Sequence, residues 1–319
     1  MQLRTVPIAL AALITVLAGA DRASSDGAGA PASSTATPAS ATAANTSIPV
    51  DSLQMADLRH CKLYGPDIPT LMEARRDVEY AFNQFRRYIG DSPPKLTIAV
   101  LGTMKDPSRV SAASLREAEV DYTVTDWPAK PGATLPPETP QLSERAGRWF
   151  LLAFEKLNAK ASPPAGKTRL VTDWYDSAIG GLCASPGEQT RRLQWMSQHI
   201  DQRIPLAKLF EMSRPERATA ASGKPKSGGA KGAAAVNPQE LFDDESLSLT
   251  RFAAMREEDR FVGWLLEPLL AGQPVSVGFN RAKTLFPRPD QLEAAWVSWV
   301  KGGMKVEPSS QEPPPPEQP

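Results

Sequence analysis

Large apolar side chains are confined to one part of the chain, and this limits where a folded domain can form. Residues 21–48 are almost entirely Ala, Ser, Thr, Gly and Pro, the stretch at about 214–240 adds a few lysines to the same mixture, and residues 306–319 are Pro-rich with PPPP at 313–316. Segments of this kind cannot bury enough apolar surface to offset the entropy lost on ordering. We therefore expect one domain over residues 49–305, with a flexible insertion and disordered ends.

The first residues have the pattern of a secretory signal. Arg4 provides a positive charge, Ile8 to Leu17 form an apolar stretch, and Ala18-Gly19-Ala20 provide small residues for cleavage. An uncleaved anchor helix is the alternative, but the apolar stretch is short for a bilayer span of about 20 residues. We expect residues 1–20 to be removed, leaving an exported protein, periplasmic or extracellular, with no integral membrane span.

The charge balance disfavours nucleic acid as a partner. Lys plus Arg and Asp plus Glu both number 36, so the formal net charge is zero. A protein without an excess of positive charge has no long-range field to gather nucleic acid or anionic lipid.

The apolar pattern from residue 59 to residue 127 predicts a helix within a small sheet. Residues 71–90 have apolar side chains at helical spacing and end at a glycine, and LTIAVLG at 96–102 is typical of a buried strand. We expect further short strands at 59–64 and 121–127, with the Pro-rich remainder of 103–141 mostly loop.

The rest of the domain is predicted to be helical, which makes the fold α+β: mainly helical, with a small mixed sheet near the N-terminus. We expect Ser143 to cap a helix that reaches about residue 159, and Asp173 to cap a helix over 173–183. Ser185 and Glu188 have the spacing of a capping box.

Three further helices complete the prediction. A short one is expected at 204–213, a long one from Leu247 to Leu269 with a bend at Pro268, and a last one that ends at Gly302.

The order of these units resembles the peptidase MA-like group of zinc metallopeptidases, the gluzincins, which includes thermolysin-like enzymes. The segments that carry the resemblance are ARRDVEYAFNQFRRYIG, KLTIAVLG, a helix at the zinc-helix position, a tryptophan-led segment, IPLAKLFEMS and LEAAWVSWV, and they span about residues 60–303. The resemblance implies a gluzincin-like domain.

The zinc-binding residues of that family are missing. Its catalytic helix carries His-Glu-x-x-His, in which two imidazoles one helical turn apart bind zinc and the Glu activates water. The matching stretch here runs from Arg145 through Ala146 and Arg148 to Trp149. Arginine repels a cation, the indole only donates, and alanine has no carboxylate, so these residues could not perform either role.

The third zinc ligand is missing as well. The family motif W-L-x-E-G-L-A corresponds to a segment that starts at Trp174, and Ser177 stands where the ligand Glu would be. Asp176 is one position away, which on a helix points about 100° from the required direction. The only two histidines, His60 and His199, lie outside the candidate zinc helix. We expect no metal, no cofactor and no catalytic residue of the metallopeptidase kind.

These observations lead to two hypotheses on function. The first is a pseudo-metallopeptidase, non-catalytic, that binds or scaffolds a peptide or another cell-envelope protein along the edge of the former cleft. The alternative is a hydrolase, a peptidase or esterase, with a relocated and metal-independent site. A triad of Ser177, His199 and Asp176 is conceivable for that alternative, but no G-x-S-x-G motif supports it.

Arg145, Arg148, Trp174 and Asp176 are the candidate ligand-binding residues. Two guanidinium groups in a former peptide cleft could hold a carboxylate or a phosphate. The alternative is that they pair locally with acids such as Glu144 or Asp176, while the tryptophans fill the space that the ligands and water have left.

The two cysteines, Cys61 and Cys183, leave two interpretations open. In an oxidising compartment they could form one disulfide, and they could equally be two buried free thiols. His60 next to Cys61 suggests no shared site, because neighbouring residues on a strand point to opposite faces.

Overall fold

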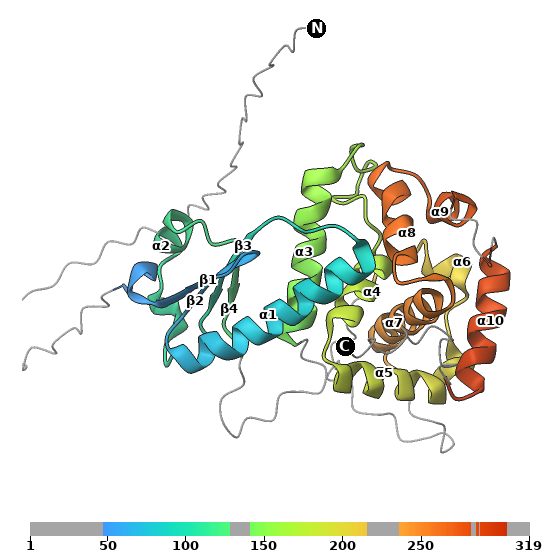
Figure 1. The fold of residues 1–319 in the computed structure, drawn as a ribbon, viewed down its shortest axis with the longest axis horizontal. Helices are drawn as coiled ribbons and strands as arrows, with labels where there is room; N and C mark the ends of the chain where they lie inside the picture. Colours follow the sequence, from blue (N-terminus) through green and yellow to red (C-terminus); the bar gives the residue numbers. More distant parts are fainter. Residues whose placement is uncertain (1–46, 128–140, 216–235, 282–284, 287, 305–319) are drawn as a thin grey trace, which may run out of the picture. The chain divides into compact units, whose positions relative to one another are not determined.

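The computed structural model describes most of the predicted domain (Figure 1). The residues that it describes are 47–127, 141–215, 236–281, 285–286 and 288–304. The predicted signal peptide, nearly all of the leader, most of the insertion and the tail lie outside the described residues. Within the described ranges, no helix is both long and apolar enough to cross a bilayer.

A four-stranded mixed sheet forms the N-terminal part of the domain, with the order β1-β2-β3-β4. The strands are β1 (Gln54–Asp57), β2 (Cys61–Gly65), β3 (Leu96–Val100) and β4 (Tyr122–Val124). β1 pairs antiparallel with β2, whereas β2, β3 and β4 run parallel. The α+β prediction is confirmed, although β1 was not predicted because its residues are largely exposed.

Helix α1 (Ile68–Ile89) connects the parallel strands β2 and β3. Asp67 caps its start by accepting the Thr70 N–H at 2.8 Å, and Gly90 ends it in the left-handed conformation with φ 90°. The predicted apolar face of α1 is buried in the main core, where it meets the sheet and helix α3 (Leu142–Asn158). A shorter helix, α2 (Ala112–Glu117), lies within the stretch that was predicted to be loop.

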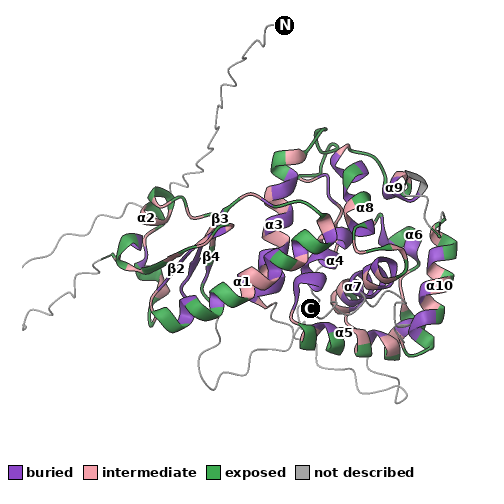
Figure 2. Cartoon of the chain, in the orientation of Figure 1, coloured by how far each residue is buried: buried purple, intermediate pink, exposed green. Residues whose placement is uncertain are grey.

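The other helices surround a buried centre formed by α4 and α7, which Figure 2 shows as mostly buried. The elements are α4 (Asp173–Cys183), α5 (Pro186–His199), α6 (Leu206–Leu209), α7 (Pro238–Glu257), α8 (Phe261–Leu270), α9 (Val275–Arg281) and α10 (Pro289–Lys301). One continuous apolar core joins them to α1, α3 and one face of the sheet. A smaller cluster with Val50 and Tyr64 covers the other face.

The predicted caps of α3 and α4 are wrong. Ser143 is buried inside the first turn of α3, and Gln141 holds the N-cap position and accepts the Arg145 N–H with its backbone oxygen. Asp173 is the first residue of α4, after the N-cap Thr172. Ser185 does cap α5, but the Glu188 carboxylate binds arginines instead of closing the capping box. Tertiary partners therefore outweigh the local pattern at these positions.

The predicted long helix is in fact two helices, and the break is not at Pro268. The chain leaves the helical conformation at Glu258, with φ 157°, and starts again as α8. Gly263 lies directly on the end of α1, since a Cβ at this position would be 2.6 Å from the Ile89 carbonyl oxygen. Packing against α1 thus sets the direction of α8, while Pro268 falls in the last turn.

Candidate functional site

Helix α3 holds the residues that match the zinc helix, and two of them face strand β4. Arg145 donates from both terminal nitrogens to the two carboxylate oxygens of Asp126, at 2.6 Å each. Trp149 stacks on Tyr122, with ring centroids 4.4 Å apart and planes 10° apart. Between them, Ala146 is fully buried. These contacts fix α3 against the edge of the sheet.

The second arginine of this stretch, Arg148, points the other way, into the interface between α3, α4 and α7. It donates to Glu144 Oε1 at 3.0 Å and to Asp176 Oδ2 at 3.2 Å, and lies 3.9 Å from Asp243 Oδ1. Gly180 makes room for it, because a Cβ at this position would be 2.5 Å from Arg148 Nε. Arg148 therefore binds acids of three different helices.

The ion pairs continue beyond Arg148 in both directions. Arg169 joins Asp176 to Glu155, with both distances 2.9 Å. On the other side, Arg192 donates to Glu144 Oε2 at 2.5 Å and to Glu188 at 2.8 Å. We call the following residues the buried ion network: Glu144, Arg148, Glu155, Arg169, Asp176, Glu188, Arg192, Arg214 and Asp243.

Ser177, which the resemblance aligns with the third zinc ligand, also lies in this region. Its hydroxyl donates to Asp243 Oδ1 at 2.7 Å, and the other oxygen of that carboxylate accepts from Arg214. Asp243 comes from α7, which follows the insertion in the sequence. The serine thus anchors α4 to α7 through a carboxylate that already has a cationic partner.

The electrostatics of the network keep its central acid ionised. Burial would raise the pKa of the Glu144 carboxyl, but the guanidiniums of Arg192 and Arg148 outweigh it and hold the pKa below its usual value. Burial similarly opposes the charge of Arg148, yet Glu144, Asp176 and Asp243 raise its pKa. The charges are therefore compensated within the protein.

The chemistry of these donors does not suit a divalent metal. A zinc site needs neutral imidazoles, thiolates or carboxylates that are free to bind the ion. In the described part of the chain, no group of three or more His, Cys, Asp or Glu side chains is placed to hold a metal. The carboxylates around Arg148 are bound by guanidinium groups, which would repel a second cation.

Trp174 serves the packing rather than an open ligand site. It is 1% exposed and lies 4.8 Å from the Phe210 ring, centroid to centroid. Of the four predicted ligand-binding residues, the structure pairs Arg148 with Asp176, pairs Arg145 with Asp126, and buries Trp174 in the core. The local ion-pair alternative describes these contacts better than an open anion site.

The side chains of the conceivable triad do not meet. Ser177 bonds Asp243, whereas the His199 ring lies 2.8 Å from the Trp195 carbonyl oxygen through Nδ1 and stacks on the Trp195 ring. Asp176 forms ion pairs with Arg148 and Arg169. The Ser177 hydroxyl bonds Asp243 and neither His199 nor Asp176, so these three residues do not form the conceivable triad.

Cys61 and Cys183 are free thiols, and both are buried. Burial raises the pKa of Cys61 to about 12 and raises that of Cys183 well above its ordinary value. His60 stacks on Phe82 at 3.9 Å between centroids, and burial lowers its pKa. The disulfide interpretation does not describe this structure, and the two thiols behave as small core residues.

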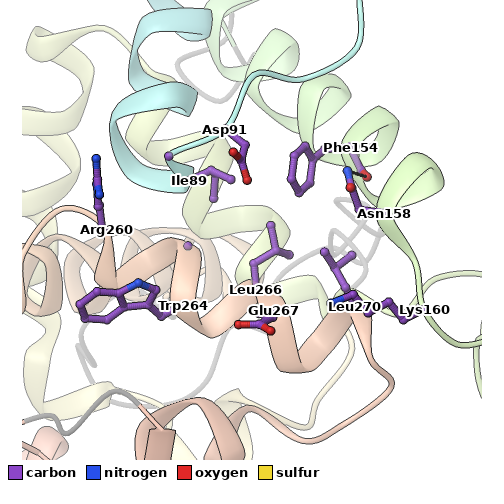
Figure 3. A pocket seen from close by; sticks show the side chains of 12 residues that line it. Ile89, Asp91, Phe154, Asn158, Lys160, Arg260, Trp264, Leu266, Glu267 and Leu270 are labelled. Atoms are coloured by element: carbon purple, nitrogen blue, oxygen red, sulfur yellow. Dashed lines mark hydrogen bonds between the residues drawn. The ribbon is translucent and has the colours of Figure 1, made fainter.

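A cavity of about 420 Å³ lies at the opposite end of α3. Figure 3 shows Asp91 at the end of α1, Phe154 on α3 and Leu266 on α8 around it. Lys160 and Arg260 also line the cavity. Because charges of both signs meet apolar walls there, its chemistry selects no single class of ligand.

Some residues of the network could be anticipated and others could not. Glu144 and Arg148 are four apart on one helix, which is the spacing of a helical ion pair. Asp126, Arg192 and Asp243 come from other elements, and nothing in their local sequence marks them. Comparisons of the chain with protein-family models, with curated proteins and with solved structures gave no match.

Proposed function

We propose that this chain is an exported, non-catalytic relative of gluzincin metallopeptidases that binds a peptide or a protein of the cell envelope. The observation that carries the proposal is that other contacts occupy the three positions that match zinc ligands: Arg145 binds Asp126, Trp149 stacks on Tyr122, and Ser177 binds Asp243. The proposal rests on the sequence pattern for the family and on these contacts for the loss of catalysis.

The buried ion network beside Ser177 is held together by paired charges. Removing one partner from a buried ion pair leaves an uncompensated charge and typically costs about 3–5 kcal/mol. A metal that displaced Arg148 would leave Arg192 as the only arginine paired with Glu144. The metal would also lie close to Arg169, the cation that pairs with Asp176. The serine at position 177 does not provide the negative charge that the third ligand brings in the family motif.

The edge of the sheet supports the binding part of the proposal. β4 is the last strand of the sheet among the described residues, and Thr123 on it is exposed. Tyr122 and Asp126 hold this edge against α3 through Trp149 and Arg145. An extended peptide could add to β4 as a further strand, with backbone hydrogen bonds as the main source of affinity.

Metal analysis tests the non-catalytic part. The purified full-length protein is dialysed against excess zinc, then against buffer, and its metal content is measured by elemental analysis. We expect far less than one zinc per chain, and stoichiometric zinc that resists dialysis would overturn the proposal.

A pair of proline variants tests the binding part. Thr123→Pro disturbs the edge strand, whereas Thr125→Pro changes an exposed residue just beyond it. We expect a library of extended peptides to yield ligands that bind the wild type and the Thr125 variant but not the Thr123 variant. Thermal unfolding of both variants shows whether the fold is kept, and equal binding by all three proteins would refute strand addition.

A further inference from the structure

A groove between α7 and α10 has the chemistry of a site for proline-rich chain. It encloses about 510 Å³, and aromatic rings line it. Phe252 lies 5.7 Å from Phe286 and 5.4 Å from Trp299, measured between ring centroids. The exposed side chain of Leu285 adds an apolar rim. Grooves lined by aromatic side chains bind polyproline II segments, because proline rings pack on the aromatic faces.

The end of α10 lies beside this groove, because Trp299 and Gly302 line it. Gly303 adopts φ 81° and donates to the Val300 carbonyl at 3.1 Å, while Met304 donates to the Trp299 carbonyl at 3.0 Å. This is a Schellman motif, which reverses the chain over the last turn of the helix. The last described residue is thus hydrogen-bonded to Trp299, an aromatic residue of the groove.

The residues that follow Met304 have the matching composition. Residues 305–319 contain the run Pro313 to Pro316, flanked by Glu312 and Glu317. Arg256 lines the groove and lies 5.9 Å from the Phe252 ring centroid. The acidic residues beside the proline run complement this positive charge.

We propose that the groove between α7 and α10 binds the chain's own residues 305–319, with Pro313–Pro316 on the aromatic rings. Eight residues lie between Met304 and Pro313, and the nine steps at about 3.1 Å each could extend about 28 Å, which is ample for a groove that begins beside Trp299. A segment tethered so closely has an effective concentration of about 1 mM or more, so modest affinity suffices to fill the groove. This inference is independent of the proposed peptidase ancestry.

The test compares binding of a free tail peptide by two full-length proteins. The probe is a fluorescent synthetic peptide of residues 305–319, and its control has alanine at the four consecutive prolines. The first protein is the wild type. The second carries Pro313→Ser, Pro314→Ser, Pro315→Ser and Pro316→Ser, which removes the internal competitor and leaves the groove intact.

We expect the peptide to bind the serine variant at least about ten-fold more tightly than the wild type, because the tethered tail no longer competes. Adding Leu285→Asp to the serine variant should abolish binding, since it places a carboxylate at the rim opposite an acidic ligand. Leu285 is 68% exposed, so this change leaves the fold intact, which circular dichroism checks.

Three outcomes would overturn the inference. They are equal affinity of the peptide for the wild type and the serine variant, absence of binding to both, and equal binding of the alanine control peptide. The first of these would show a groove that is open to proline-rich ligands and is not occupied by the chain's own tail.

Discussion

Glu245 of α7 should make the stability of the domain depend on pH. Its side chain is fully buried, and one carboxylate oxygen accepts the Ile204 N–H at 2.8 Å. The other oxygen, Oε1, has no hydrogen-bond partner. Burial raises the pKa of Glu245 to about 8, and the Ile204 N–H offsets this only in part. The group is therefore protonated in the folded protein at neutral pH.

The sign of the effect follows from proton linkage. The folded-state pKa lies above the unfolded value of about 4.3, so the folded protein holds the proton between these two values and unfolding releases it. The contribution of protonated Glu245 to the free energy of unfolding is complete below about pH 4 and is lost as the pH rises toward 8. At about 1.4 kcal/mol per pH unit, the loss totals at most about 5 kcal/mol.

Glu245→Gln removes this titration and keeps an oxygen for the Ile204 N–H. We expect the variant to match the wild type at pH 5 within about 1 kcal/mol, and to be about 2–4 kcal/mol more stable at pH 9. The assay is urea unfolding followed by circular dichroism from pH 5 to pH 9. Burial also raises the pKa of Asp244 to about 8, but this contribution is common to both proteins and cancels.

The control is Glu73→Gln, which changes an exposed glutamate on α1. This variant should leave the plot of unfolding free energy against pH unchanged in shape. If the plots of unfolding free energy against pH were parallel for the wild type and the Glu245 variant, the reasoning would be refuted. Parallel plots would mean that Glu245 is ionised in the folded protein at neutral pH.

Three further predictions concern the packing of the site. Arg148→Met should lower the free energy of unfolding by about 3–5 kcal/mol, since it leaves buried carboxylates without this cationic partner. Arg145→Met should lower it by less than about 1 kcal/mol, because the partner of Arg145 is half exposed. Similar losses for both variants in urea unfolding would contradict the stabilising role of the buried ion network. Gly147→Ala should cost about 1–3 kcal/mol, because its Cβ would lie 2.5 Å from the Cys183 Cβ, and Gly187→Ala, with open space around it, should be neutral. The two buried thiols should react with a thiol reagent only as fast as the protein unfolds, so rapid labelling of the native protein would show that one of them is accessible.

Local patterns predicted those elements whose stability is largely local. The apolar spacing of α1 and the glycine at its end identify the helix, and the apolar runs of β2 and β3 identify buried strands. The absence of two histidines one helical turn apart was also readable, because His60 and His199 are the only histidines and lie far apart in the sequence. These features require no knowledge of which segments meet in space.

Positions governed by distant partners escaped prediction. Ser143 has the side chain of a helix cap, yet it lies two residues after the N-cap Gln141 and is buried by the packing of α3. The break at Glu258 has no strong local signal, and it follows from the seating of α8 on the end of α1.

The sequence by itself determined that this chain forms a mainly helical α+β domain and that it contains no His-Glu-x-x-His motif. The tertiary structure alone decided how Arg148 is paired, because this side chain gains its partners from α4 and α7 as well as from its own helix. A buried charge is tolerated only where opposite charges from distant segments surround it. That condition depends on the packing of the helices, which local residue patterns do not specify.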